Sequence, residues 1–315
     1  MRILVTGSRG KVGSATVDAL HAAGHEVTAC DLAPPVFEAT APGTPVYKQA
    51  DLTDAGDAYA VVRDHDAVIH AAAIPEPTRN PPHVVFQNNL MGVFNTLEAA
   101  IRLGVPRFVN VSSETVPGFF FPERPWVADY APVDEEHPIR PQDPYATAKY
   151  FGEQLMDAAM RRSDIRCLTI RPTWVQWEGN YESNLGPVLR DPEAAPSPGF
   201  WAYIDVYDLA DSLLLAAQSD LDRHEVFYIA SPDNSANRPL ADLIRHHHGD
   251  DFEIREPLPR PDASGLSIAK AEKLLGYAPT RSWRDYLGAD GTLLDAARER
   301  LERGDTGVQR GRAVG

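Results

Sequence analysis

Cysteine is scarce in this sequence of 315 residues, which contains only Cys30 and Cys167. Each lies in a short apolar stretch of the kind that forms a buried strand. Two buried free thiols are therefore favoured over a disulfide, and a reducing, cytoplasmic compartment is expected. A small fold held together by disulfides is disfavoured.

Long apolar runs are also missing. The chain starts with MRILVTGSRG, a strand that runs directly into a glycine turn, and not with the basic and apolar regions of a secretory signal. No apolar run approaches the roughly 20 residues that a membrane helix needs. We therefore expect no membrane partner.

Positive charge is in short supply, because 30 Lys and Arg residues stand against 45 Asp and Glu residues, a formal net charge of −15. A field of that sign repels phosphate backbones, so nucleic acid is not expected as a partner. A metal site is not expected either. The consecutive residues His246, His247 and His248 fall on a predicted helix and would point in different directions.

The first two-thirds of the chain alternates short β-branched runs with longer helical patterns. This order is typical of an α/β, Rossmann-type doubly wound parallel sheet. The predicted strands are Arg2–Thr6, Glu26–Cys30, Val46–Lys48, Ala67–His70, Arg107–Val111 and Cys167–Arg171. The predicted helices are Val12–Ala23, Asp54–Arg63, Val84–Leu103 and Tyr145–Arg161.

The composition changes after Arg171, where proline, tryptophan and glycine become frequent. We expect a dinucleotide-binding domain over residues 1–171 and a smaller C-terminal substrate lobe over 172–290. Within that lobe, residues 201–231 are predicted to return to the sheet. Residues 298–315 are charged and lack apolar periodicity past Leu301, so they are predicted to form a disordered tail.

A glycine turn formed by Gly7, Gly10 and Gly13 separates the first strand from the first helix. Glycines at this position let a pyrophosphate approach the helix N-terminus, where free N–H groups favour negative charge. Asp31 closes the second strand 18 residues after Gly13. Its carboxylate would bind the ribose hydroxyls of NAD and repel the 2′-phosphate of NADP. Arg9 leaves NADP open as the less favoured cofactor, because its guanidinium could bind that phosphate.

Further cofactor contacts are predicted along the same edge of the sheet. Asp51 and Leu52 follow the third strand and could hold the adenine amino group. Three alanines end the fourth strand and would let the cofactor lie flat. The remaining predicted cofactor residues are Lys11 and Val12 of the glycine turn, together with Ala71, Ala72 and Ala73.

Tyr145 and Lys149 lie four residues apart on a predicted helix and so share one face of it. An ammonium beside a phenol favours the phenolate, which predicts a lowered pKa for Tyr145 and a role in proton transfer. Upstream, the fifth strand ends in the paired serines Ser112 and Ser113.

In this order the segments TGSRGKVG, HAAA, QNNLMGVFNTLEAA, VSSETVPG, PYATAK, TIRP and YIDVYDLAD resemble the extended short-chain dehydrogenase/reductase superfamily, in the branch of NAD-dependent epimerases and dehydratases. The resemblance covers about residues 1–290. It implies that Tyr145 is the general acid/base, that Lys149 binds the nicotinamide ribose and that Ser113 hydrogen-bonds the reacting oxygen. Tyr145 and Lys149 thereby count as cofactor contacts too. It also implies that Asn89 braces the active-site backbone.

The helices over 84–103 and from Tyr145 onward pair between subunits in many relatives, so a homodimer is expected. Their apolar faces could equally be intramolecular core.

Three departures from the family pattern bear on the substrate. Dehydratases carry Thr-Asp-Glu where this chain has Ser113, Glu114 and Thr115, so water elimination is disfavoured and the role of Glu114 is open. The segment Pro172–Trp201 is short, and its single basic residue, Arg190, predicts weak binding of a nucleotide diphosphate. The aromatic insertion Phe119–Trp126 either walls the substrate pocket or packs as a surface loop.

These features favour an NAD-dependent oxidoreductase, a dehydrogenase/reductase acting on CH–OH groups. Its substrate would be a secondary alcohol or lactol of a small sugar-, uronate- or polyol-like compound. A nucleotide-sugar 4-epimerase with tightly bound NAD is the first alternative. A non-catalytic NAD-sensing regulator is the second, and the intact Ser113, Tyr145 and Lys149 argue against it.

Overall fold

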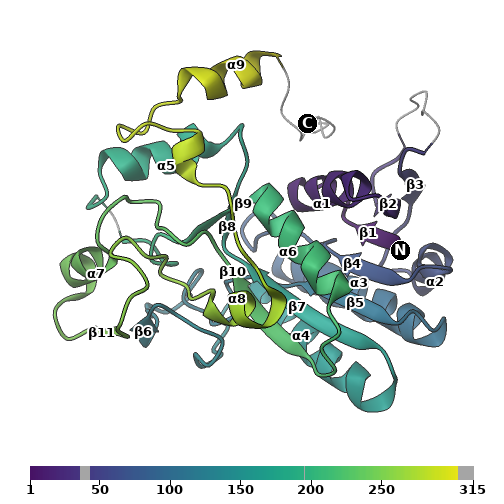
Figure 1. Cartoon of the computed structure of the whole chain (residues 1–315). Helices are drawn as coiled ribbons and strands as arrows, with labels where there is room; N and C mark the ends of the chain where they lie inside the picture. The colour runs from purple at the N-terminus through teal and green to yellow at the C-terminus, as the bar shows by residue number, and fades with distance from the viewer. Residues whose placement is uncertain (36–42, 195, 304–315) are drawn as a thin grey trace.

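A seven-stranded parallel sheet forms the centre of the protein in a computed structural model, which describes residues 1–35, 43–194 and 196–303 (Figure 1). Its strand order is β10-β7-β5-β4-β1-β2-β3. The strands are β1 (Arg2–Thr6), β2 (Glu26–Asp31), β3 (Val46–Gln49), β4 (Ala67–His70), β5 (Arg107–Val111), β7 (Arg166–Pro172) and β10 (Glu225–Ile229). The chain order reverses between β1 and β4, and a ligand cleft is expected at that point, at the carboxyl ends of the strands.

Helices cover both faces of the sheet. On one face α1 (Lys11–Ala22) packs against α6 (Val206–Gln218), and α8 (Ala269–Leu275) joins them. The other face carries α2 (Ala55–Val62), α3 (Pro82–Arg102) and α4 (Pro144–Arg162). Strand β1 shows why the apolar runs are continuous, because Ile3 and Val5 enter the first core while Leu4 enters the second. The predicted Rossmann-type α/β fold is confirmed.

A smaller lobe lies at the side of the sheet where β10 forms the edge (Figure 1). Its elements are β6 (Tyr130–Ala131), β8 (Trp174–Gln176), α5 (Tyr181–Arg190), β9 (Tyr203–Asp205), α7 (Leu240–His248), β11 (Glu253–Ile254), a 3-10 helix (Trp283–Asp285) and α9 (Asp295–Arg303). Its core joins Phe119 of the aromatic insertion to Phe200 and Leu240. Part of the predicted dinucleotide domain, residues 119–133, therefore contributes to this core.

Helix α9 differs from the sequence-based expectation, which placed a disordered tail from Arg298 onward. The helix continues to Arg303, with Ala297 buried and Arg300 paired with Glu178 at 2.5 Å. These contacts come from distant parts of the chain, so the local charge pattern did not reveal them. The rest of the predicted tail, residues 304–315, lies outside the described residues. Among the described helices, none is long and apolar enough to cross a membrane.

Candidate active site

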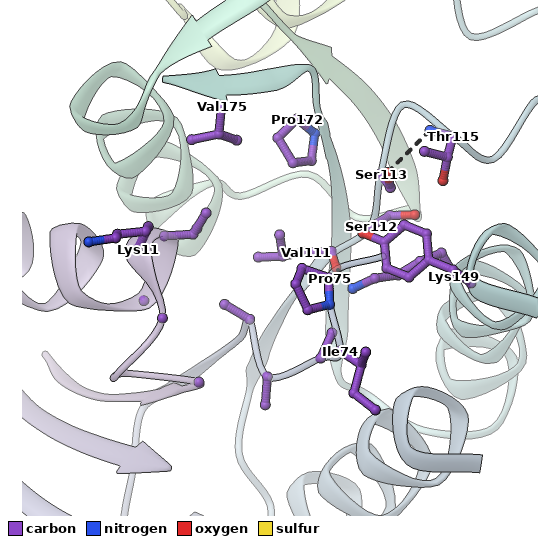
Figure 2. A pocket seen from close by; sticks show the side chains of 18 of the residues that line it. Lys11, Ile74, Pro75, Val111, Ser112, Ser113, Thr115, Lys149, Pro172 and Val175 are labelled. Carbon is purple, nitrogen blue, oxygen red and sulfur yellow. Dashed lines mark hydrogen bonds between the residues drawn. The ribbon is translucent and has the colours of Figure 1, made fainter. Parts of the chain in front are cut away.

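A cavity of about 960 Å³ opens at the carboxyl ends of β1, β4 and β5. It runs from the glycine turn to the segment after β5, and Figure 2 shows Lys11 on one side of it with Ser113 and Lys149 on the other. All but one of the predicted site residues line it: Gly7, Arg9, Gly10, Lys11, Val12, Gly13, Asp31, Asp51, Leu52, Ala71, Ala72, Ala73, Ser113, Tyr145 and Lys149. Asn89 lies behind the wall.

The glycine turn brings backbone close to backbone. Gly7 has a φ of +69°, and a Cβ there would lie 2.7 Å from the Cα of Ala72. A Cβ on Gly13 would collide with the carbonyl oxygen of Gly7. The turn therefore needs glycine at both positions, and it places the N-terminus of α1 at the cavity, where N–H groups can bind a phosphate.

Asp31 lies at the far end of the same half of the cavity. Its carboxylate accepts hydrogen bonds from the backbone N–H groups of Arg9 (2.8 Å) and Ala33 (3.2 Å). The Arg9 guanidinium stacks on the ring of Tyr47, 4.5 Å from its centroid. The two side chains that bear on cofactor choice thus flank one end of the cavity, and the preference for NAD over NADP stays a prediction.

Asn89 of α3 holds the backbone that follows β4. Its Oδ1 accepts from the N–H of Ile74 at 2.7 Å, and its Nδ2 donates to the carbonyl of the same residue at 3.0 Å. This two-way clamp fixes the chain after Ala71–Ala73, where that chain forms the cavity wall (Figure 2).

Ser113, Tyr145 and Lys149 lie together in the cavity wall and are all buried. Helix α4 begins here because Asp143 caps it, accepting from the N–H of Ala146 at 2.9 Å. Lys149 donates to the carbonyl oxygen of Val111 at 2.6 Å, which ties α4 to the end of β5. The Ser113 hydroxyl lies near enough to the Tyr145 phenol to act on its pKa.

The pKa of Tyr145 differs from the prediction made from the sequence. Burial raises the pKa of Tyr145 to about 12, against the opposing effect of the Ser113 hydroxyl, whereas a lowered pKa was predicted. The Lys149 ammonium lies 5.8 Å from the phenol ring, too far to outweigh the loss of water. Burial also lowers the pKa of Lys149 to about 8, which the nearby Glu153 opposes.

A buried ion pair beneath Lys149 was not foreseen from the sequence. Glu153 accepts from Arg171 of β7 at 2.8 and 2.6 Å and from the hydroxyl of Ser112 at 2.6 Å. Both charged side chains are at most 4% exposed. Two signals were available: Glu153 stands four residues after Lys149, and Arg171 ends an apolar strand. Neither signal says that the two charges meet.

The other end of the cavity combines aromatic and uncharged surface with one acidic side chain, that of Glu114. Phe120 and Phe121 of the aromatic insertion line this end, while Phe119 packs in the lobe core. Both interpretations of the insertion therefore hold in part, because two of its residues form cavity wall and a third packs inside the lobe. Arg190 does not line the cavity and donates instead to the carbonyl of Gly291 at 3.3 Å.

Residues 3–190 match the NAD dependent epimerase/dehydratase family. The chain belongs to this family. The resemblance inferred from the motifs is thereby confirmed. The glycine turn has no room for a side chain at Gly7 or Gly13, and the N-terminus of α1 can bind a phosphate. The half of the cavity that these elements line therefore suits NAD, the dinucleotide that the family name specifies.

Relatives of the chain carry out different reactions. A dTDP-glucose 4,6-dehydratase from Streptomyces niveus is 28% identical over 91% of this chain and 90% of its own length. An L-arabinose 1-dehydrogenase (NAD(P)(+)) from Haloferax volcanii is 32% identical over 55% of this chain and 67% of its own. The structure of a UDP-galactose 4-epimerase is 28% identical, with a TM-score of 0.65 over 95% of this chain and 99% of its own. Similarity therefore gives the family and leaves the reaction open.

Proposed function

We propose that this protein is an NAD-dependent dehydrogenase that acts on a secondary alcohol or lactol carbon of a small, sugar- or polyol-like compound. One observation carries the proposal. The described cations that line the cavity, Arg9, Lys11 and Lys149, lie in the glycine turn or beside Tyr145, and none lies at the end bounded by Phe120 and Phe121. A substrate bound at this end would be held through its hydroxyl groups and its apolar surface, because no described cation lies there to bind a negative charge.

In this proposal the glycine turn and Asp31 would hold NAD, which would supply the acceptor for the hydride that leaves the substrate carbon. Tyr145 Oη, as the phenolate, takes the hydroxyl proton, so the substrate loses one hydride and one proton and becomes a carbonyl compound. Ser113 donates a hydrogen bond to the reacting oxygen and orients it. The Lys149 ammonium, held by Val111, stabilises the phenolate.

A nucleotide-sugar substrate is disfavoured because the substrate end of the cavity lacks a described cation to bind its diphosphate. Anchoring a diphosphate takes charge-assisted hydrogen bonds, commonly from arginine. Arg190 bonds Gly291 instead of facing the cavity, and Arg260 is paired with Asp262 at 2.6 Å. Elimination of water is disfavoured as well, because Thr115 stands where the dehydratases have a carboxylate.

The 4-epimerase alternative is supported by the full-length likeness to an epimerase structure, and one experiment separates it from the dehydrogenase. The purified protein is assayed for retained NAD, then screened with neutral aldoses, uronates and UDP-sugars while the absorbance of reduced nicotinamide is followed. We expect dependence on added NAD, turnover of a free sugar or polyol and no micromolar binding of UDP by calorimetry.

Retained NAD together with isomerisation of a UDP-sugar would overturn the proposal. Tyr145→Phe is the matched control, since it removes the proton acceptor and leaves the cavity shape unchanged. Turnover that survives in this variant would show that the reaction takes place elsewhere.

A further inference from the structure

Glu114 is a buried carboxyl group that the chemistry above does not use. It directly follows Ser113, and its backbone N–H is fixed by the carbonyl of Pro172 at 3.1 Å. The residue is 8% exposed and forms part of the cavity wall. Its Oε2 lies against Gly199, where an added Cβ would sit 3.2 Å from that oxygen and 2.9 Å from the ring of Phe120.

Two polar atoms beside Ser113 have no protein partner. Within the described part of the chain, neither Oε2 of Glu114 nor Oγ1 of Thr115 has a hydrogen-bond partner, although both atoms are buried. Native proteins rarely leave such atoms unsatisfied unless a ligand or water completes them. Thr115 donates its backbone N–H to Ser113 Oγ at 3.2 Å (Figure 2). The two unpartnered oxygens therefore belong to the same short turn as the Ser113 hydroxyl.

The protonation state of Glu114 determines what it can bind. Burial raises its pKa well above the ordinary value, and no charged neighbour contributes to that shift. Burial therefore favours the uncharged carboxylic acid, which both donates and accepts hydrogen bonds, whereas a carboxylate only accepts. A sugar hydroxyl also donates and accepts, so it matches such a group in both directions.

A substrate with a carboxylate would meet an unfavourable environment at this position. The cavity end that holds Glu114 has no described cation to compensate a second acidic group. Burying an unpaired charge is costly, and a neighbouring carboxyl group adds repulsion whenever it ionises. Neutral hydroxyl groups avoid both penalties.

We propose that Glu114, through its unpartnered Oε2 in the cavity wall, hydrogen-bonds a hydroxyl of the substrate and thereby selects a neutral aldose or polyol over a uronate. This inference rests on the proposed dehydrogenase function. It makes Glu114 a specificity-determining residue, distinct from the proton transfer assigned to Tyr145. It also excludes the anionic part of the substrate class that the motifs alone leave open.

The test compares an aldose with the uronate of the same ring stereochemistry, in the wild type and in Glu114→Gln and Glu114→Leu. In the wild type we expect kcat/KM to favour the aldose by about 10-fold or more. Glu114→Gln keeps a neutral donor and acceptor of the same size and should lose no more than about threefold. Glu114→Leu removes both and should lose about 10- to 100-fold, mainly through KM.

Calorimetry with NAD reports whether each variant retains its fold, since Glu114 lies outside the cofactor half of the cavity. Glu135→Gln is the matched control. This carboxyl group also has a raised pKa caused by burial, but it accepts from the N–H of Tyr228 and does not line the cavity. Its loss should leave the preference for the aldose in place.

The outcomes separate the two proposals. A free sugar that Glu114→Leu oxidises as well as the wild type does would overturn the role of Glu114 and leave the dehydrogenase standing. A wild-type preference for the uronate, or equal damage from Gln and Leu, would do the same. If no free sugar or polyol reacts, the dehydrogenase proposal fails, and this inference fails with it.

Discussion

Replacing Glu153 by glutamine tests whether the buried ion pair supports the centre of the site. The side chain keeps its size, but Arg171 loses the carboxylate that binds it at 2.6 and 2.8 Å. Arg171 is 4% exposed, so its charge would stay buried without an anionic partner. Breaking such a pair typically costs about 3–5 kcal/mol. We expect the free energy of unfolding of Glu153→Gln to fall by that amount.

The same substitution should move the pKa of Lys149. Burial already lowers this pKa to about 8, and the negative charge of Glu153 opposes the effect. Removing that charge leaves Arg171 nearby as an uncompensated cation, so the pKa should fall further below about 8. Lys149 then loses its proton at a lower pH. The alkaline limb of kcat/KM, where the ammonium is needed, should shift to lower pH.

Urea unfolding and a pH–rate profile measure the two effects. Glu98→Gln is the matched control, because Glu98 also forms an ion pair with an arginine between α3 and α4. In that pair Arg162 is 42% exposed, and exposed pairs contribute about 0–1 kcal/mol. A loss in Glu153→Gln no larger than in the control would refute the reasoning. An unmoved alkaline limb would refute the link to Lys149.

Three further predictions concern the cofactor and the chemistry. Asp31→Ala should narrow a preference for NAD over NADP in a binding titration, and a wild type that prefers NADP would show that Arg9 decides. Tyr145→Phe should bind NAD nearly normally and lose about 10²–10⁴-fold in turnover, because only the proton acceptor is removed; a wild-type rate would contradict this. Gly7→Ala should weaken NAD binding, since the added Cβ would collide with the backbone of Ala72. Gly24→Ala is the control, because Gly24 also has a positive φ, of +81°, but a Cβ there meets nothing within 4 Å, so it should cost only about 1–2 kcal/mol of stability. Equal NAD affinity in the two variants would contradict the steric argument.

The sheet was predictable because its strands are local patterns. β1, β4 and β5 have the predicted ends, and β2, β3 and β7 are longer by one or two residues. Apolar runs covered on both faces are hard to mistake for anything else. The two-residue strands β6 and β11 were not predicted, because their pairing joins residues more than 120 positions apart and leaves no periodicity in either segment.

The site also contains features that local sequence patterns predict and one that they do not. The glycine turn and Asp31 belong to a strand–turn–helix–strand unit, so the sequence alone predicts their proximity and the structure brings them together at the cavity. The Tyr145 pKa was mispredicted because spacing along a helix reports which groups are neighbours and says nothing about water. Burial is a property of the whole fold, and here it outweighs the nearby ammonium.

Burial shifts the pKa values of Tyr145 and Lys149 in opposite directions, and both shifts disfavour the charged form of the side chain. A phenol with a pKa near 12 and an amine with a pKa near 8 are both held toward their uncharged forms, so the centre resists charge until something compensates it. The nicotinamide of bound NAD carries a positive charge, which would favour the phenolate. Proton transfer is then coupled to cofactor binding, and this predicts that the kinetic pKa assigned to Tyr145 is lower in the NAD complex than the pKa measured in the free protein.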